Sequence, residues 1–165
     1  MSRIITTFFG VGLLRPAPGT WGSLAAVILA VIAYQAGFAL LVPVGAVVAT
    51  LAGFWAVPRV TAALADPDPG EIVIDEVAGQ WLAMSFTVIP LWRHGIDIFA
   101  AWPGIVAPFL LFRLFDIWKP WLVGRADRRG DAAGVMLDDL WAGLFAGLMS
   151  VLLAGLYHGV IGGML

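Results

Sequence analysis

Two pairs of adjacent acidic residues border apolar stretches of this sequence. Asp75 and Glu76 follow the run IVI, and Asp138 and Asp139 precede the run LWAG. Carboxylates inside a membrane boundary are costly and usually functional. Asp138 and Asp139, two adjacent acids about 5 Å apart, would repel each other by roughly 3 kcal/mol at an effective dielectric near 20, so we expect a cation or proton shared nearby. The structural alternative is that the acids cap or charge helix N-termini, where each contributes about 1 kcal/mol.

A third group of charged residues follows one helical stripe. Arg113, Asp116 and Lys119 are spaced three residues apart, and Pro120 closes the helix that carries them. A guanidinium and an ammonium with a carboxylate between them could clamp a phosphate beside a metal ligand. The alternative is a ladder of ion pairs within one helix, with cations that reach toward water.

The motif PGTWGS, residues 18–23, suggests a helix start. A Pro-Gly turn with Thr20 or Ser23 as the cap would explain it. Glycine-flanked amides at a helix N-terminus also form anion sites. The motif therefore predicts either a cap or a place for a phosphate group.

The composition indicates which elements must position these residues. Of the chain, 61% is hydrophobic and 12% is charged, whereas soluble domains carry about a quarter of their residues as Asp, Glu, Lys and Arg. We therefore expect lipid to cover much of the surface.

The net charge of −2 and the absence of any long Lys/Arg run argue against a nucleic-acid partner. The absence of cysteine excludes thiolate nucleophiles, thiolate zinc sites and disulfides.

The chain is predicted to be one all-α domain over residues 1–165, a small polytopic membrane bundle of about five apolar helices. A short helix near the N-terminus, within Ile4 to Leu14, is expected to lie in the membrane interface. The predicted apolar segments are Gly22 to Ala36, Phe38 to Val57, Ile72 to Pro90, Ile96 to Phe115 and Leu140 to Tyr157.

With five spans, the charged residues gather at one membrane face. Arg93 and Asp97 alone fall opposite. Cytoplasmic loops of membrane proteins carry an excess of Lys and Arg, so the face with most cations is predicted to be cytoplasmic. The cations of this face are Arg3, Arg15, Arg59, Arg113, Lys119, Arg125, Arg128 and Arg129. The positive-inside rule counts Lys and Arg and is nearly indifferent to acids, so it does not explain why ten acids share this face. A polar site at the face would explain it. The ten acids are Asp66, Asp68, Glu71, Asp75, Glu76, Asp116, Asp127, Asp131, Asp138 and Asp139.

Four motifs in register resemble those of the phosphatidylglycerophosphatase A family. They are PGTWGS, DPGEIVIDEVAGQW, FRLFDIWKPW and DRRGDAAGVMLDDLWAG, and the likeness spans roughly residues 8 to 147. The chain departs from the family pattern at Ala132-Ala133, where relatives carry a Gly-Gly pair. This departure bears on the flexibility of the loop more than on catalysis.

The resemblance implies a magnesium-dependent phosphoric monoester hydrolase of phospholipid biosynthesis. Its substrate would be phosphatidylglycerol phosphate in the bilayer, hydrolysed to phosphatidylglycerol and phosphate at the cytoplasmic face of a bacterial inner membrane. The resemblance assigns three roles: metal ligands at Asp75, Glu76, Asp138 and Asp139; catalytic residues at Asp116, Lys119 and Asp127; and substrate contacts at Thr20, Arg113 and Arg128. Hard carboxylates suit Mg²⁺, which would bind phosphate oxygens while Arg and Lys offset charge.

Three other functions compete with this interpretation. A CDP-alcohol phosphotransferase also binds metal with carboxylates at a membrane face, but its long aspartate signature is absent from the sequence. A cation transporter could use Asp75, Glu76 and Asp139, but an ion path should continue through the spans, and these acids stop at one face. An aspartyl phosphatase of the haloacid dehalogenase type needs a sheet that these helical segments do not provide. The attacking nucleophile, a metal-activated water or an aspartate, stays open at this point.

Overall fold

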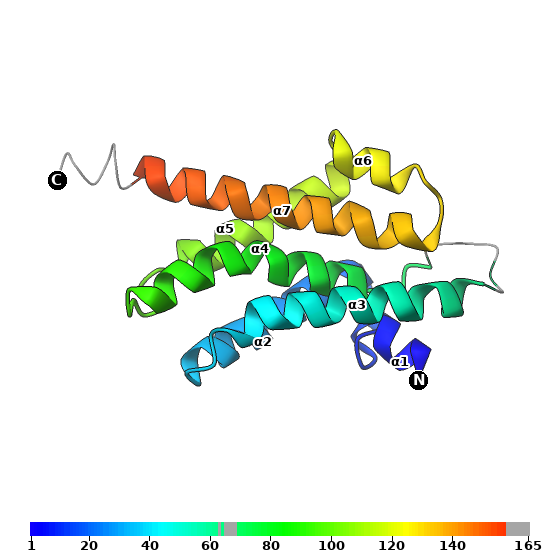
Figure 1. Ribbon diagram of the computed structural model, residues 1–165, viewed down its shortest axis with the longest axis horizontal. Helices are drawn as coiled ribbons and strands as arrows, with labels where there is room; N and C mark the ends of the chain where they lie inside the picture. Colours follow the sequence, from blue (N-terminus) through cyan, green and yellow to red (C-terminus); the bar gives the residue numbers. More distant parts are fainter. Residues whose placement is uncertain (63, 65–68, 158–165) are drawn as a thin grey trace.

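A computed structural model describes residues 1–62, 64 and 69–157 of the chain, and all regular secondary structure in this part is helical (Figure 1). Asp66 and Asp68, two acids predicted at the charged face, lie outside the described residues. The α-helices are α1 (Ser2–Thr6), α2 (Pro18–Gln35), α3 (Leu41–Thr61), α4 (Ile74–Arg93), α5 (Pro103–Trp118), α6 (Leu122–Asp127) and α7 (Ala132–Leu156), with a 3-10 helix, η1 (Val11–Leu13). The all-α fold is confirmed over these residues.

Three helices are long and apolar enough to cross a membrane by length and composition: α2, α3 and α7. The five predicted apolar segments overlap α2, α3, α4, α5 and α7. Within the described residues, however, α4 and α5 do not meet the same measures of length and hydropathy. The number of five spans therefore stays a prediction.

Two helices begin earlier than their apolar segments suggested. Helix α2 starts at Pro18, whose fixed φ suits the first position of a helix. Helix α7 starts at Ala132, and the Asp131 side chain caps it by accepting a hydrogen bond of 2.7 Å from the Gly134 N–H. Both early turns contain polar residues or glycines, so apolar periodicity misses them.

The N-terminal segment is shorter and more broken than the predicted interfacial helix. Helix α1 ends at Thr6, and Phe8 and Phe9 have positive φ values of 44° and 57°. The segment packs onto the bundle, because the Val73 N–H donates a 2.8 Å hydrogen bond to the Thr6 carbonyl. It thereby supports the residue that immediately precedes α4.

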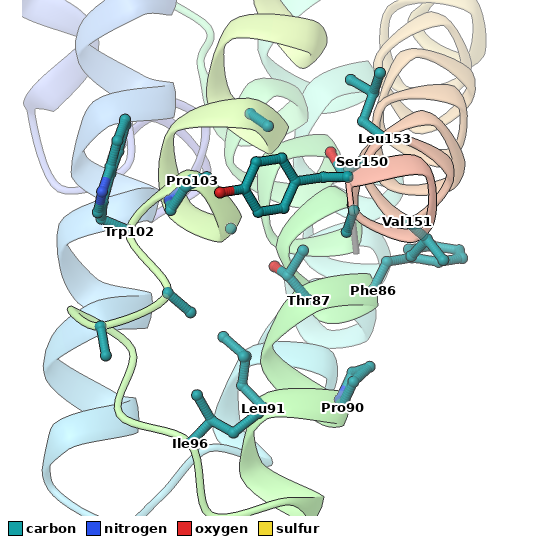
Figure 2. A pocket seen from close by; sticks show the side chains of 16 residues that line it. Phe86, Thr87, Pro90, Leu91, Ile96, Trp102, Pro103, Ser150, Val151 and Leu153 are labelled. Carbon is teal, nitrogen blue, oxygen red and sulfur yellow. The ribbon is translucent and has the colours of Figure 1, made fainter. Parts of the chain in front are cut away.

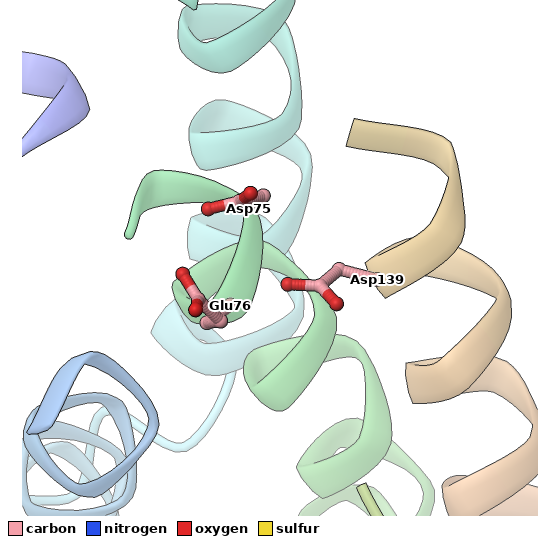
Figure 3. A group of neighbouring side chains, drawn as sticks. All are labelled: Asp75, Glu76 and Asp139. Atoms are coloured by element: carbon pink, nitrogen blue, oxygen red, sulfur yellow. The ribbon is translucent and has the colours of Figure 1, made fainter. Parts of the chain in front are cut away.

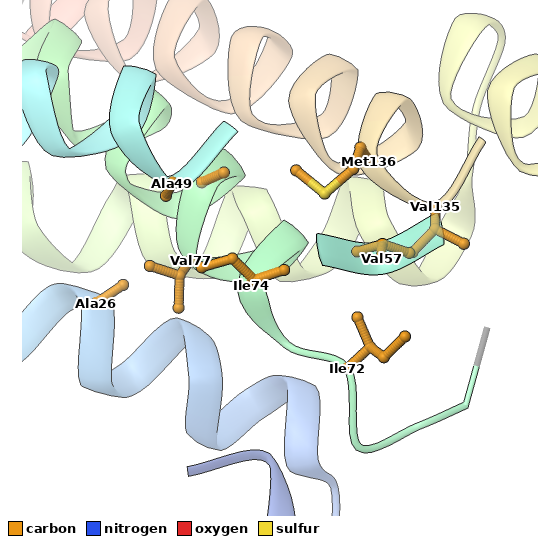
Figure 4. Packing of buried hydrophobic residues seen from close by; sticks show 9 residues of the cluster. Ala26, Ala49, Val57, Ile72, Ile74, Val77, Val135 and Met136 are labelled. Carbon is orange, nitrogen blue, oxygen red and sulfur yellow. The ribbon is translucent and has the colours of Figure 1, made fainter. Parts of the chain in front are cut away.

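Helix α4 is the centre of the bundle and contacts α2, α3, α5 and α7. One buried apolar cluster joins α2, α3, α4 and α7, and Figure 4 shows Met136 of α7 pointing toward the Ala49 and Ile74 side chains. Where α4 crosses α7, Gly79 faces Gly143, and a Cβ atom on Gly143 would collide with the Gly79 backbone. Small residues let these two backbones approach closely.

The bundle has one strongly charged end. Figure 1 shows α1, the end of α3, the start of α4, α6 and the start of α7 gathered at the right, and the α4–α5 connection at the left. These segments, together with the end of α5 and the residues just before α2 and α4, carry the described cations and acids that were predicted to share a face. Arg93 and Asp97 lie instead by the α4–α5 connection. The fold thus brings the charged motifs to the same end of the molecule.

Candidate functional site

Three carboxylates from two helices converge at the charged end. Asp75 and Glu76 lie in the first turn of α4, and Asp139 points from α7 toward α4 (Figure 3). One oxygen from each side chain can be chosen so that all three lie within 4.8 Å of one another. Asp75 and Asp139 are only 5% and 3% exposed. Such a cluster of hard oxygen donors can hold a metal ion.

The glycine crossing between α4 and α7 sets this convergence. Gly79 lies one turn after Asp75, and Gly143 lies one turn after Asp139. Because the two glycines are in backbone contact, the acids that precede them by a turn are drawn together. The site therefore rests on backbone packing between two helices that are distant in the sequence.

The positions of the acids separate two interpretations that the sequence left open. Asp138 and Asp139 are the seventh and eighth residues of α7, and Asp131 caps that helix. The interpretation of Asp138 or Asp139 as an N-cap is therefore wrong. Asp75 and Glu76 do lie in a first turn, where the helix dipole favours acids, but they are also drawn into a buried cluster with an acid of another helix.

Helix α5 adds a guanidinium and a fourth carboxylate. The Arg113 Nη1 atom lies 2.7 Å from Asp116 Oδ2 and 4.0 Å from Glu76 Oε1. Asp116 also lies close enough to Asp139 to interact with it electrostatically. The expected pair between Arg113 and Asp116 is confirmed. The pair does not belong to an isolated surface ladder, because it adjoins the acid cluster.

The first turn of α2 closes another side of the site. A Cβ atom on Gly19 would collide with the Glu76 carboxylate and lie 3.3 Å from Arg113 Nη1. Ser23 accepts a hydrogen bond of 3.3 Å from Arg113 and donates one of 2.8 Å to the Gly19 carbonyl. Thr20, half-buried, lies in the same turn. Neither Thr20 nor Ser23 caps the helix, because α2 begins at Pro18 with Ala17 at the N-cap; that prediction is wrong.

Lys119 joins three segments in a second charged cluster beside the first. Helix α5 ends at Trp118, and Lys119 follows in a left-handed conformation with φ 52°. Its ammonium pairs with Asp127 and donates a 2.9 Å hydrogen bond to Asp138. Partial burial lowers the pKa of Lys119, but hydrogen bonds to Asp127 and Asp138 outweigh it, so the pKa is raised above its ordinary value. Lys119 therefore stays protonated at neutral pH.

The structure separates Asp138 from the other residues expected to bind metal. One Asp138 oxygen accepts from Lys119, and the other accepts a 3.0 Å hydrogen bond from the Asp139 N–H. Arg128, expected to contact substrate, is exposed at the end of α6. The residues expected at the site thus divide into an inner group with Asp139 and an outer group with Lys119. The exposed Arg128 has its guanidinium beside Gly124, near the backbone of Lys119.

Sequence reasoning overlooked Gln80. This side chain is fully buried on α4, one turn after Glu76, and both amide atoms lack a hydrogen-bond partner. Glu76 Oε2 and Arg113 Nε are also buried without a partner. The available signal was an amide within an apolar stretch, at the spacing that places it on the same helical face as the acid.

A large apolar cavity lies toward the other end of the bundle, between α4, α5 and α7 (Figure 2). It measures about 820 Å³. The Thr87 and Ser150 hydroxyls that line it donate to carbonyls of their own helices. Among the described lining residues, these two hydroxyls are therefore already engaged within their own helices.

Comparisons with known proteins find relatives that are 31% to 36% identical to this chain. A Haemophilus influenzae protein named phosphatidylglycerophosphatase A is 35% identical over 145 residues, covering 87% of this chain and 83% of the relative. The Escherichia coli protein of the same name is 31% identical over 149 residues, covering 87% and 78%. A Bacteroides thetaiotaomicron protein whose name proposes a phosphatidylinositol-3-phosphatase is 36% identical over 147 residues, covering 87% of each chain. No solved structure matches the chain.

The model of one protein family covers nearly the whole helical bundle. It is described as phosphatidylglycerophosphatase A, and it matches residues 4–154. That range includes the first turn of α2, both acidic pairs, and the α5–α6 connection. The chain belongs to the phosphatidylglycerophosphatase A family.

Proposed function

We propose that this protein is a membrane phosphoric monoester hydrolase that removes the terminal phosphate of phosphatidylglycerol phosphate. The products would be phosphatidylglycerol and inorganic phosphate, which places the reaction in phospholipid biosynthesis. Membership of the family supports this activity. The observation that carries the proposal is the buried cluster of Asp75, Glu76 and Asp139 at the charged end of an apolar bundle.

The acid cluster fits a divalent metal ion, and we propose Mg²⁺. The donor set consists only of carboxylate oxygens, which Mg²⁺ prefers, from three acids packed too closely to stay charged together without a cation. Asp75, Glu76 and Asp139 would hold the ion. Bound there, it would supply Lewis-acid stabilisation of phosphate oxygens.

We assign the binding of the phosphate group to Arg113. Its guanidinium lies between Glu76 and Asp116, and the pair with Asp116 fixes its orientation. Thr20, in the first turn of α2, would add a hydroxyl at the positive end of a helix. These groups would offset the negative charge that the phosphate brings into the site.

The outer cluster would act at the aqueous side of the same site. Lys119 holds Asp127 of α6 and Asp138 of α7, so it ties the α5–α6 connection to the helix that carries Asp139. We assign its ammonium a second role in attracting the terminal phosphate, with Asp127 as the acid that positions it. Arg128 would add positive charge at the exposed rim.

The charged end would face the cytoplasm of a bacterial cell, with the bundle in the inner membrane. This orientation rests on the one-sided distribution of Lys and Arg. The apolar character of α2, α3 and α7 supports placement in a bilayer. A phospholipid in the same leaflet would then bring its headgroup to the level of the acids.

Phosphate release from phosphatidylglycerol phosphate by the purified protein in detergent tests the proposal. We expect release with Mg²⁺ and none with a chelator. Asp75→Asn, Glu76→Gln and Asp139→Asn should each abolish release while the protein still folds. The matched control is Glu71→Gln, which removes an acid at the same end that pairs with Arg3, 3.1 Å away. Wild-type turnover in all three site variants would refute the metal site.

Phosphatidylinositol 3-phosphate is the second substrate to assay, because one relative's name proposes that activity. We expect faster release from phosphatidylglycerol phosphate. A preference for the inositol lipid would keep the phosphatase chemistry but overturn the proposed substrate.

A further inference from the structure

Gln80 is a buried polar residue that the proposed chemistry does not use. Its side chain is fully buried, and neither its amide nitrogen nor its amide oxygen has a hydrogen-bond partner. Buried polar groups in native proteins are nearly always satisfied, so each exception requires an explanation. An apolar side chain of similar size would fit this position at no such cost.

The position of Gln80 follows from its neighbours along one stripe of α4. Glu76 lies one turn before it, against Gly19 of α2 and Arg113 of α5. Met84 lies one turn after it and belongs to a cluster that includes α2 and α5 side chains. Since residues four apart share a helical face, Gln80 also faces the junction between α2 and α5. It lies about 6 Å deeper in the bundle than Glu76.

Three side chains at this junction carry polar atoms without partners. They are the Gln80 amide, Glu76 Oε2 and Arg113 Nε, and all these atoms are buried. The set contains both donors and acceptors, because an amide offers NH₂ and C=O, a guanidinium donates, and a carboxylate accepts. A metal ion would satisfy only the acceptors, and a phosphate only the donors. A hydroxyl group can serve both.

We propose that Gln80 binds the free secondary hydroxyl of the substrate's headgroup glycerol. This inference rests on the proposed function. The glycerol links the terminal phosphate to the phosphodiester, and its central carbon carries the hydroxyl. With the terminal phosphate at the acids and the lipid chains toward the membrane, the linker would lie at the depth of Gln80. The amide NH₂ donates to the hydroxyl oxygen, and the hydroxyl donates to the amide oxygen.

The test compares two lipid substrates that differ by one oxygen atom. One is phosphatidylglycerol phosphate, and the other carries 1,3-propanediol in place of the headgroup glycerol. Phosphate release is measured in detergent with Mg²⁺ for the wild type, for Gln80→Met, and for the control Ser85→Ala. Ser85 is a buried polar residue of the same helix whose hydroxyl already donates to the Trp81 carbonyl, 2.7 Å away.

We expect the wild type and Ser85→Ala to prefer the hydroxylated substrate by about tenfold to 100-fold in kcat/KM, because the deoxy analogue leaves the buried amide without a partner. Gln80→Met should reduce this preference to about threefold or less, with little change toward the deoxy analogue. Thermal unfolding checks that the variant is folded.

Equal use of both substrates by the wild type would overturn the inference, and that measurement does not depend on any variant. If Gln80→Met lowered kcat/KM equally for both substrates, the inference would also be overturned. The amide would then stabilise the fold or bind an ordered water rather than the hydroxyl. If the wild type hydrolysed neither substrate, the proposed function would fail, and this inference with it.

Discussion

Gly143→Ala should strongly lower phosphatase turnover, although Gly143 is not one of the proposed site residues. The added Cβ would lie 2.8 Å from the carbonyl carbon of Gly79 and 2.9 Å from its Cα, whereas carbon atoms pack best at about 3.5–4.0 Å. Both partners are backbone atoms, so no side chain can rotate away. The two helices must separate by about 0.6–1.2 Å, at a cost of about 1–3 kcal/mol of stability.

The larger effect is expected on turnover. Asp139 lies one turn before Gly143, and it would move away from Asp75 and Glu76 by a similar distance. A misplacement of about 1 Å can lower a rate by about 100-fold. We therefore expect kcat to fall by about two orders of magnitude while the protein remains folded at room temperature.

The assay is phosphate release at saturating Mg²⁺ and substrate, together with thermal unfolding in the same detergent. Gly155→Ala is the matched control, because Gly155 is on the same helix and a Cβ there meets nothing within 4 Å. We expect the control to keep wild-type turnover. If Gly143→Ala stayed within twofold of wild type, the glycine crossing would not position the acids.

Two further predictions follow from the charged end. Lys119→Met should lower phosphate release by about 100-fold, because it removes the cation between Asp127 and Asp138 and an electrostatic donor to the phosphate. If the variant kept more than about a fifth of wild-type turnover, Lys119 would have only a structural role. In intact cells, a cysteine at position 94 should react with an impermeant thiol reagent and a cysteine at position 125 should not; the opposite pattern would reverse the topology.

The sequence predicted the helical class and the residues of the inner cluster, because acids beside apolar runs are rare enough to stand out. Asp75 and Glu76 were expected at the start of a helix, and α4 begins one residue before them. The pairing of Arg113 with Asp116 followed from helical spacing alone. Local features of this kind depend on residues a few positions apart in the chain, so they can be predicted from the sequence alone.

Contacts between distant segments could not be predicted in the same way. Asp138 and Asp139 are adjacent, yet one pairs with Lys119 and the other joins the α4 acids, because successive residues of a helix point about 100° apart. Which acid faces which neighbour depends on the crossing of α4 and α7, and that crossing is decided by two glycines. Gln80 was missed because one amide at helical spacing from Glu76 is a weak signal, and its significance appears only when hydrogen-bond partners for its side chain are sought.

The glycine contact between α4 and α7 also has a consequence for biogenesis. Helix α7 is the last helix of the described chain, and it supplies Asp139. Membrane helices generally insert first and associate afterwards. A nascent chain, or one truncated before Ala132, would therefore carry Asp75 and Glu76 without the third acid. Metal affinity would appear only when the final helix docks, so ion binding would report completed assembly of the bundle.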